Sequence, residues 1–483
     1  MVRSIPVRMS LVESVRHFLS RIQPPSLFLF LALTFGLTVL AANPPFQSAD
    51  EYEHFFRAFQ LSQGTVIALK SGDTVGGMLP ALVNNVAQTE GIPFHPEKKM
   101  TSAIFRRKLK PLWVEWNSSP ASSPVMFISF PHTAVYAPSG YLPQTVALVI
   151  GKLLRIGPLG MMYFARLAGF SAALCLGYAA LEIVPIYRWS MMLVLLCPTN
   201  LYLMGSVAPD GILIGGAFLL VALLARMTLE PDHAVPLSER TAILILAGML
   251  ATAKFVYLPL TAAAFLLAFP NLGSYWQKAT FGAACVVFCV VPTWVWCHVV
   301  SLLYVPGRTD IPIDPVAQLQ VIKHAPLGFL VLIARTIKMD YWTNYRSVVA
   351  LMGWADTYAP SWYYPVYGCG LLGCLTLESD FARFVLPWQR LVLLGTAISG
   401  AGLIYVTEYL IWNSPGSRAS MQGISGRYFL PLAPLVLLSF PPVMGPKARE
   451  RWAIAVGSLM GTISAAVCLW SVVARYYIVS LRS

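Results

Sequence analysis

The sequence predicts an all-α polytopic membrane protein with about eleven transmembrane helices and a large first extracytoplasmic loop. Of its 483 residues, 57% are hydrophobic and only 11% are charged, whereas a soluble globular protein carries roughly 25% charged residues. The mean hydropathy is +0.65, and apolar runs recur from Leu27 to Tyr477. These observations exclude a soluble enzyme with one membrane anchor, a disordered chain, and an outer-membrane barrel, whose strands alternate over about ten residues.

The surplus of positive charge does not indicate a nucleic-acid partner. The net charge is +13, from 34 Lys and Arg against 21 Asp and Glu, but the basic residues are scattered between apolar runs and form no dense stripe. Positive-inside topology and contacts with anionic membrane lipids account for this pattern. Most of the eight cysteines lie in apolar runs without CxxC spacing, as small buried hydrophobes do. Pairing of Cys369 with Cys374 stays open.

The first membrane span precedes a long polar stretch. Residues 1–25 carry four arginines against one glutamate, which predicts a cytoplasmic N-terminus. The first transmembrane helix is expected over 26–42, and the polar, proline-rich residues 43–158 are then expected to form an extracytoplasmic loop subdomain. Within it, Tyr141–Ile156 is apolar but short and contains two basic residues, which favours a helix that lies in the membrane interface.

Two groups of transmembrane helices follow, over 159–304 and 363–483, with a second extracytoplasmic loop over 305–362 between them. The apolar run 241–269 is broken by Lys254 and Pro259, so it forms either one bent span or a tight hairpin. The hairpin is preferred because it places the second loop outside, where Pro326–Lys338 is expected to lie in the interface. The spans are expected at 159–186, 189–206, 209–227, 241–269, 279–304, 363–377, 389–411, 427–443 and 452–479.

A polar motif follows the first span, and it reads Pro44-Pro45-Phe46-Gln47-Ser48-Ala49-Asp50-Glu51-Tyr52-Glu53-His54-Phe55-Phe56-Arg57. It predicts a short helix with Ser48 as N-cap and Glu51 where a capping box places its acid. At 100° per residue, Asp50, His54 and Arg57 share one face. A solvated helix start, whose acids favour the helix dipole, is the plain alternative. The motif is the densest polar cluster in a chain short of charge, where such groups are usually functional.

The motif resembles the bacterial membrane-protein family called domain of unknown function 2142, which opens with a PPF-x-x-x-DE-x-x-H-x-x-R pattern after its first helix. The resemblance covers nearly the whole chain in the same order. One departure is Glu53, where a small or apolar residue is more usual. The further matching segments are Tyr136–Gln144, Arg166, Ser206–Asp210, Gly353–Asp356 and Gln422–Pro431, the last of which fits a QG-x-x-GRYF pattern.

That family is similar in layout to the GT-C glycosyltransferases, which have many helices and an acidic pair at the start of a large outer loop. The resemblance implies a GT-C-like fold and transfer of a sugar from a polyprenyl-phosphate carrier to an envelope glycan, lipid or protein. The site would face the periplasm or exterior of the bacterial inner membrane. Asp50 and Glu51 would be catalytic, with Asp50 as the general base that deprotonates the acceptor hydroxyl.

No cofactor is expected for this reaction, and the sugar carrier is a substrate. The carboxylates near His54 could bind a divalent metal ion, so metal binding stays an open alternative. The sequence has no HExxH motif and no cysteine cluster, so no metal ligand is assigned.

The predicted substrate-binding residues lie close to the outer surface. Arg427 follows two glycines and opens a span, so it is the preferred phosphate ligand, with a snorkelling arginine as the alternative. Lys254 either meets the phosphate or forms a salt bridge within the bundle. Asp210 either binds substrate or caps the helix that follows it. Arg57 either clamps phosphate or pairs with Glu53 in its own helix. The remaining predicted binding residues are His54, Tyr136, Tyr141 and Tyr428. A set of aromatic residues either stacks on sugars or forms aromatic belts at the membrane surface, namely Tyr136, Tyr141, Trp342, Trp354 and Trp362.

Two other functions compete with sugar transfer. A transporter or flippase of lipid-linked sugars predicts inverted repeats and broken helices at the midplane, and a non-catalytic subunit of an envelope polysaccharide assembly would use the large loop to bind partners. The sequence shows no internal repeat, and its polar residues gather at the outer face. The transferase is therefore the preferred hypothesis.

Overall fold

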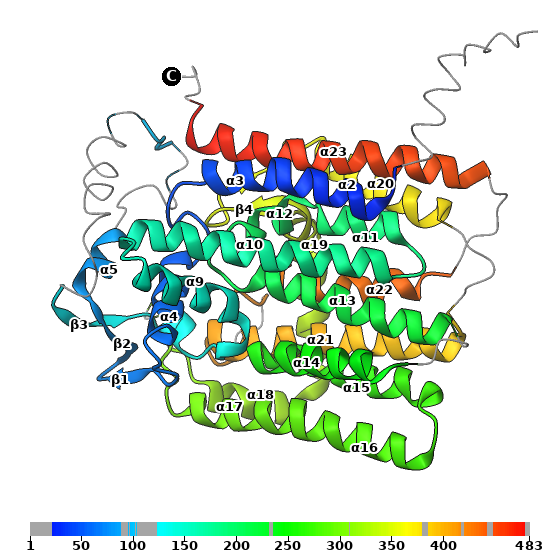
Figure 1. The fold of residues 1–483 in the computed structure, drawn as a ribbon. Helices are drawn as coiled ribbons and strands as arrows, with labels where there is room; N and C mark the ends of the chain where they lie inside the picture. The colour runs from blue at the N-terminus through cyan, green and yellow to red at the C-terminus, as the bar shows by residue number, and fades with distance from the viewer. Residues whose placement is uncertain are drawn as a thin grey trace, which may run out of the picture.

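The apolar runs of the sequence form long helices that lie side by side, and a small layer of helices and strands covers one end of them (Figure 1). The computed structural model describes residues 22–87, 95, 97–101, 103, 123–230, 235–308, 310–378, 385–416, 420–441 and 448–478. Most of the predicted cytoplasmic segment 1–25 therefore lies outside the described residues. We call the covered end the motif end, because it carries the polar motif that follows the first span.

Within the described residues, six helices are long and apolar enough to cross a membrane. They are α2–α3 (Pro24–Leu31 and Leu37–Ala42, joined by a π-helical turn), α10 (Pro158–Ile183), α13 (Asp210–Leu229), α16–α17 (Tyr275–Cys285 and Val291–Ser301, also joined by a π-helical turn), α21 (Pro387–Trp412) and α23 (Ala448–Tyr476). A seventh would combine α18 (Pro315–His324) with α19 (Pro326–Ala350), which are bent by 106° at their junction. The chain is a polytopic membrane protein.

The structure does not reach the expected number of about eleven spans. The other predicted spans are shorter helices, namely α11 (Arg188–Leu195), α12 (Pro198–Met204), α14 (Leu237–Ala253), α15 (Pro259–Ala268), α20 (Tyr363–Leu377) and α22 (Ala433–Ser439). Proline explains two of the breaks, because Pro198 and Pro259 begin new helices where an uninterrupted helix would need their missing N–H.

The run 241–269 forms a hairpin, as the sequence analysis preferred. At its turn, Lys254 Nζ lies 2.7 Å from Asp210 Oδ1, at the start of α13. Beyond α15, the Asn271 side chain donates a hydrogen bond to the carbonyl of Met227, near the other end of α13. α14 and α15 therefore run in opposite directions along one neighbouring helix, and Lys254 lies at the motif end.

The layer at the motif end contains strands, so the predicted all-α class is wrong for this part of a mostly helical protein. β1 (Leu69–Ser71), β2 (Thr74–Pro80) and β3 (Val125–Ser129) form an antiparallel sheet in that order. Gly76 lies on the central strand, where a Cβ would be 1.9 Å from the carbonyl oxygen of Ile128. Only glycine fits there. A second pair joins β4 (Leu351–Met352) to β5 (Thr357–Tyr358).

Among the described residues, five short helices complete this layer, namely α4 (Glu51–Leu61), α5 (Ala81–Ala87), α8 (Pro131–Ala134), the 3-10 helix η5 (Pro138–Tyr141) and α9 (Leu142–Leu153). α9 falls where the sequence predicts an interfacial helix. It buries Gln144 and Leu148 and leaves Leu142, Val146 and Leu153 exposed. An exposed apolar stripe is what such a helix needs, and its position relative to lipid stays a prediction.

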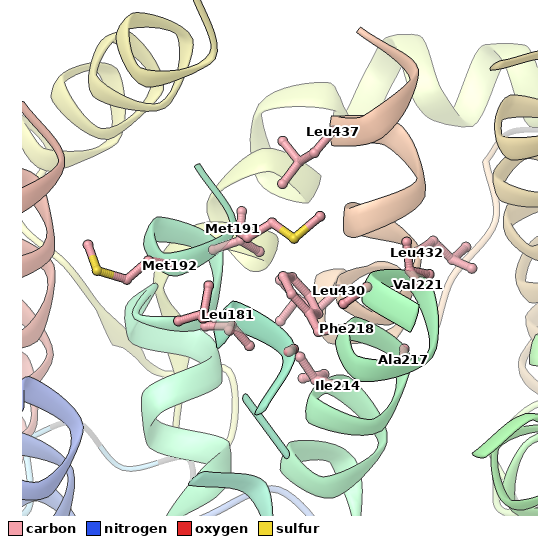
Figure 2. Close-up of a cluster of buried hydrophobic side chains, with 14 of the residues drawn as sticks. Leu181, Met191, Met192, Ile214, Ala217, Phe218, Val221, Leu430, Leu432 and Leu437 are labelled. Carbon is pink, nitrogen blue, oxygen red and sulfur yellow. The ribbon is translucent and has the colours of Figure 1, made fainter. Parts of the chain in front are cut away.

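Large apolar side chains from distant segments fill the centre of the bundle (Figure 2). Phe218 on α13, Met191 on α11 and Leu430 are all fully buried, and the close-up shows them turned towards one another. Leu430 belongs to the 3-10 helix η9 (Gly426–Leu432), which begins with the last polar motif of the sequence. Because lipid is as apolar as these side chains, close packing rather than release of water stabilises the arrangement.

Candidate functional site at the motif end

A buried ion pair fixes α4 against the bundle. Arg166, on α10, donates from Nη2 to Glu51 Oε2 at 2.6 Å and from Nε to Oε1 at 2.8 Å, and both side chains are fully buried. Arg166 also donates to the carbonyls of Leu40, Asn43 and Pro44, at the end of the first span. Glu51 accepts a further bond from the backbone of Val207. Glu51 therefore has a structural position, and we do not retain it as a catalytic residue.

Asp50 has a different environment from its neighbour. It is the N-cap residue of α4 and lies in the left-handed region at φ +56°. Ser48, the predicted N-cap, does not hold that place, although its backbone N–H donates to Glu51 Oε2 at 3.4 Å, which is one half of the predicted capping box. The Asp50 side chain is 32% exposed. Asp50 is therefore accessible at the helix start, whereas Glu51 is sealed beneath it.

Arg427 brings a positive charge to Asp50 from the other half of the chain. Its Nη2 lies 3.6 Å from Asp50 Oδ2 and 3.4 Å from the Tyr428 hydroxyl. Its Nε is buried and has no hydrogen-bond partner in the described part of the chain. Gly426 positions it, because the Gly426 N–H donates to Ser347 Oγ and a Cβ there would lie 2.2 Å from the backbone nitrogen of Val348. Arg427 retains capacity for a ligand.

A second ion pair lies beside this one. Lys254 bonds to Asp210 at 2.7 Å, and both side chains are nearly buried. The Lys254 ammonium also lies 5.5 Å from the ring centroid of Tyr136 and 4.9 Å from that of Tyr428, within the range of a cation–π contact. Lys254 thus forms the intrabundle salt bridge that the sequence left open. Asp210 makes no side-chain cap, since Pro209 precedes α13 in that position.

His54 is a neutral, buried part of the same cluster. Its Nδ1 lies 2.6 Å from the hydroxyl of Tyr141, and its ring lies 5.7 Å from that of Tyr136. Burial lowers the pKa of His54 to about 4 and raises the pKa of both tyrosines. At neutral pH the three side chains therefore carry no charge, and they form a polar wall around the charges of Asp50, Asp210, Lys254 and Arg427.

Arg57 does not join this cluster, which corrects its predicted role as a phosphate ligand. Its Nε and Nη2 donate to the Tyr136 carbonyl at 3.2 and 2.9 Å, Nη1 donates to Gln60, and Nη2 also donates to the Val66 carbonyl. The side chain is fully buried. The alternative partner, Glu53, binds elsewhere. Arg57 anchors the loop that carries Tyr136, so its contribution to the site is indirect.

A profile described as "Predicted membrane protein (DUF2142)" matches residues 33–436. This range covers most of the chain and every residue of the cluster. The chain belongs to the DUF2142 family. No curated protein and no solved structure matches it.

In this DUF2142 chain, three residues near the cluster were not predicted from the sequence as site residues, namely His132, Arg166 and Glu408. Glu53 binds His132 through two contacts, from the His132 backbone N–H at 2.9 Å and between Glu53 Oε1 and His132 Nδ1 at 2.7 Å. His132 Nε2 reaches the Gly307 carbonyl at 3.3 Å, and its ring stacks on Trp412. No sequence signal marked His132. Arg166 was noted only as part of the resemblance, and its partner could not be read from spacing.

The third missed residue, Glu408, carried a signal. It lies inside the apolar helix α21, where an acid is costly and usually functional. The rule that singles out Lys254 applies equally to Glu408. Of the predicted aromatic residues, Trp354 stacks on Tyr52 at 5.8 Å, close to Asp50, and donates to the Phe46 carbonyl. Trp342 instead stacks on Tyr345 of α19, and Trp362 meets Tyr363 of α20 edge-on.

The arrangement gathers most of the predicted site at the motif end of the DUF2142 chain. Asp50 can accept a proton from a group that approaches from solvent, because it is partly exposed and only distantly paired. The Arg427 cation can attract an anion, and its Nε has no hydrogen-bond partner among the described residues. Within the described residues, no three His, Cys, Asp or Glu side chains are grouped as metal ligands.

Proposed function

We propose that this DUF2142 protein is a membrane glycosyltransferase, which moves a sugar from a polyprenyl-phosphate carrier to an envelope glycan, lipid or protein. One observation carries the proposal. A partly exposed carboxylate, Asp50, lies beside the under-bonded cation Arg427 at one end of a membrane-spanning bundle. The resemblance in layout to the GT-C glycosyltransferases, which is expected from the sequence, supports the proposal only as an analogy of fold. The motif end then faces the exterior of the bacterial inner membrane.

The reaction needs a base and a cation, and the two residues supply them. The acceptor hydroxyl attacks the anomeric carbon, and a new carbon–oxygen bond forms. The bond between that carbon and the carrier phosphate oxygen breaks, and the polyprenyl phosphate leaves with the bonding electron pair. Asp50 takes the proton of the hydroxyl. Arg427 stabilises the negative charge that develops on the leaving phosphate.

The other members of the cluster hold these two groups in place. Lys254 adds positive charge close to the proposed phosphate position, and Asp210 fixes its ammonium. Tyr428 lies between the two cations, in contact with both. His54 and Tyr141 remain neutral and bonded to each other, so they position the wall of the site without competing with Asp50 for the proton.

The decisive test replaces Asp50 by Asn in purified protein supplied with polyprenyl-phosphate sugars and a mixed set of acceptors. General base catalysis contributes about a hundredfold or more, so we expect sugar transfer by Asp50→Asn to fall by at least that factor. Asp73→Asn, at an exposed turn before β2, is the matched control and keeps full activity.

Undiminished transfer by Asp50→Asn would show that another group is the base. A wild-type protein that moves lipid-linked sugar across liposomes, without transferring it, would identify a transporter instead.

A further inference from the structure

Glu408 is a buried acid whose carboxylate the protein does not fully bond. The residue is 7% exposed, and its Oε2 is buried without a hydrogen-bond partner among the described residues. A buried polar atom in this state costs free energy, and native proteins retain such atoms rarely. Its backbone is well bonded by contrast, because the Glu408 carbonyl accepts from Asn413 Nδ2 at 2.9 Å.

An exposed glycine packs closely against this carboxylate. A Cβ on Gly423 would lie 2.8 Å from Glu408 Oε2 and 2.7 Å from Trp412 Cγ, and Gly423 itself is exposed with φ +88°. Asn413 holds the loop in this position, since its Oδ1 accepts from the Gln422 N–H at 2.9 Å. The Glu408 carboxylate therefore lies just beneath an exposed turn that leaves no room for a side chain.

The Glu408 carboxylate interacts electrostatically with Arg427, the residue proposed to bind the phosphate. The charges of Lys254 and Arg427 both act on its carboxylate, and Glu408 in turn acts on Tyr136 and Tyr428. Arg427 Nε is also buried and without a partner in the described chain. The site thus offers one unsatisfied hydrogen-bond acceptor and one unsatisfied donor, carried by different helices.

We propose that the Glu408 carboxylate binds a hydroxyl group of the donor sugar, an inference that rests on the proposed function. A phosphate held by Arg427 places the attached sugar ring beside that phosphate, within the neighbourhood of Glu408. A sugar hydroxyl donates a hydrogen bond to the unpartnered Oε2, which the anionic phosphate itself cannot do. Glu408 is therefore a specificity residue for the sugar, and it does not take part in the bond changes at the anomeric carbon.

The experiment compares two kinds of ligand on three proteins. Wild type, Glu408→Gln and Glu182→Gln are placed in lipid nanodiscs doped with polyprenyl phosphate, or with polyprenyl phosphates that carry glucose, galactose, mannose or arabinose. Binding is measured by native mass spectrometry, and thermal unfolding checks that each variant is folded. Glu182 is an exposed acid at the far end of α10, so its substitution is the matched control.

We expect wild type and Glu182→Gln to bind at least one sugar-bearing carrier more tightly than bare polyprenyl phosphate. Loss of a hydrogen bond to a buried acceptor costs about tenfold in affinity, so Glu408→Gln loses that preference by about this factor and keeps its affinity for the bare carrier. Three outcomes would overturn this inference and leave the proposed function standing. They are an unchanged preference of Glu408→Gln for the sugar-bearing carrier, an equal loss of affinity for both ligands, and a wild type that shows no preference. Wild type that binds neither ligand overturns the proposed function, and this inference with it.

Discussion

Arg57 donates hydrogen bonds from all three of its guanidinium nitrogens to protein atoms, whereas Nε of Arg427 has no partner among the described residues. The sequence predicted a phosphate ligand at both positions, for Arg57 because the guanidinium fork suits phosphate oxygens, and for Arg427 because it follows two glycines and opens a span. The difference depends on carbonyl groups that approach Arg57 from Val66 and Tyr136, which are distant in sequence. Residue type and spacing therefore indicate that an arginine is buried near a site, and tertiary contacts decide whether it can bind a ligand.

The pair of His132 and Glu53 predicts a pH dependence of stability. The hydrogen bond to Glu53 raises the pKa of His132 to about 9, above its ordinary value of about 6.5. The charged pair stabilises the folded state fully below pH 6.5, and this contribution is lost as the pH rises through about 9. We expect the melting temperature of wild type to fall between pH 7 and 10 by more than that of His132→Gln. His95→Gln, which removes the exposed pair with Glu97, should follow the wild-type curve. Identical curves for wild type and His132→Gln would contradict the prediction.

At the scale of elements, the hairpin of α14 and α15 decides the side of the membrane for all that follows it. We expect cysteines at Leu237 and Ser274, which flank the hairpin, to be labelled from the same side of a sealed vesicle. A cysteine at Phe255, in the exposed turn at the motif end, should be labelled from the opposite side. The measurement uses a membrane-impermeant thiol reagent on a background without the native exposed Cys175 and Cys369. Labelling of positions 237 and 274 from opposite sides would show a single bent span.

The sequence predicted the positions of most long helices because each is a continuous apolar run, and it predicted the hairpin because Lys254 and Pro259 interrupt one. It missed the sheet of β1, β2 and β3, whose strands are only three, seven and five residues long. β1 and β2 form a tight hairpin, but β3 begins only at Val125, far along the chain. Charge scarcity drew attention to Asp50 and Lys254, and the family resemblance and the positions at span starts indicated the other members of the cluster. The roles within the cluster were not predicted, since the sealing of Glu51 by Arg166 joins residues 115 positions apart.

At the scale of the molecule, α23 completes the bundle although all of it lies beyond the family match at residues 33–436. A Cβ on Gly457 of this helix would lie 2.4 Å from the Trp189 ring of α11. We expect Gly457→Ala to destabilise the protein by about 1–3 kcal/mol through overpacking. Gly395→Ala, on α21 where no atom lies within 4 Å, should be neutral or slightly stabilising. The comparison is made by thermal unfolding in detergent, and a stability unchanged by Gly457→Ala would show that the two helices are not tightly packed.

The left-handed backbone at Asp50 limits which side chains can replace it. Asparagine and glycine enter this conformation readily, whereas a β-branched residue at φ +56° adds strain of roughly 1–2 kcal/mol. Replacement by alanine or valine would therefore disturb the start of α4 and the carboxylate together. Asparagine has the shape of aspartate and tolerates the same backbone, so it removes the charge alone. In homologues of this chain that have an uncharged residue at position 50, Asn or Gly there would indicate that the base is lost while the local fold is preserved.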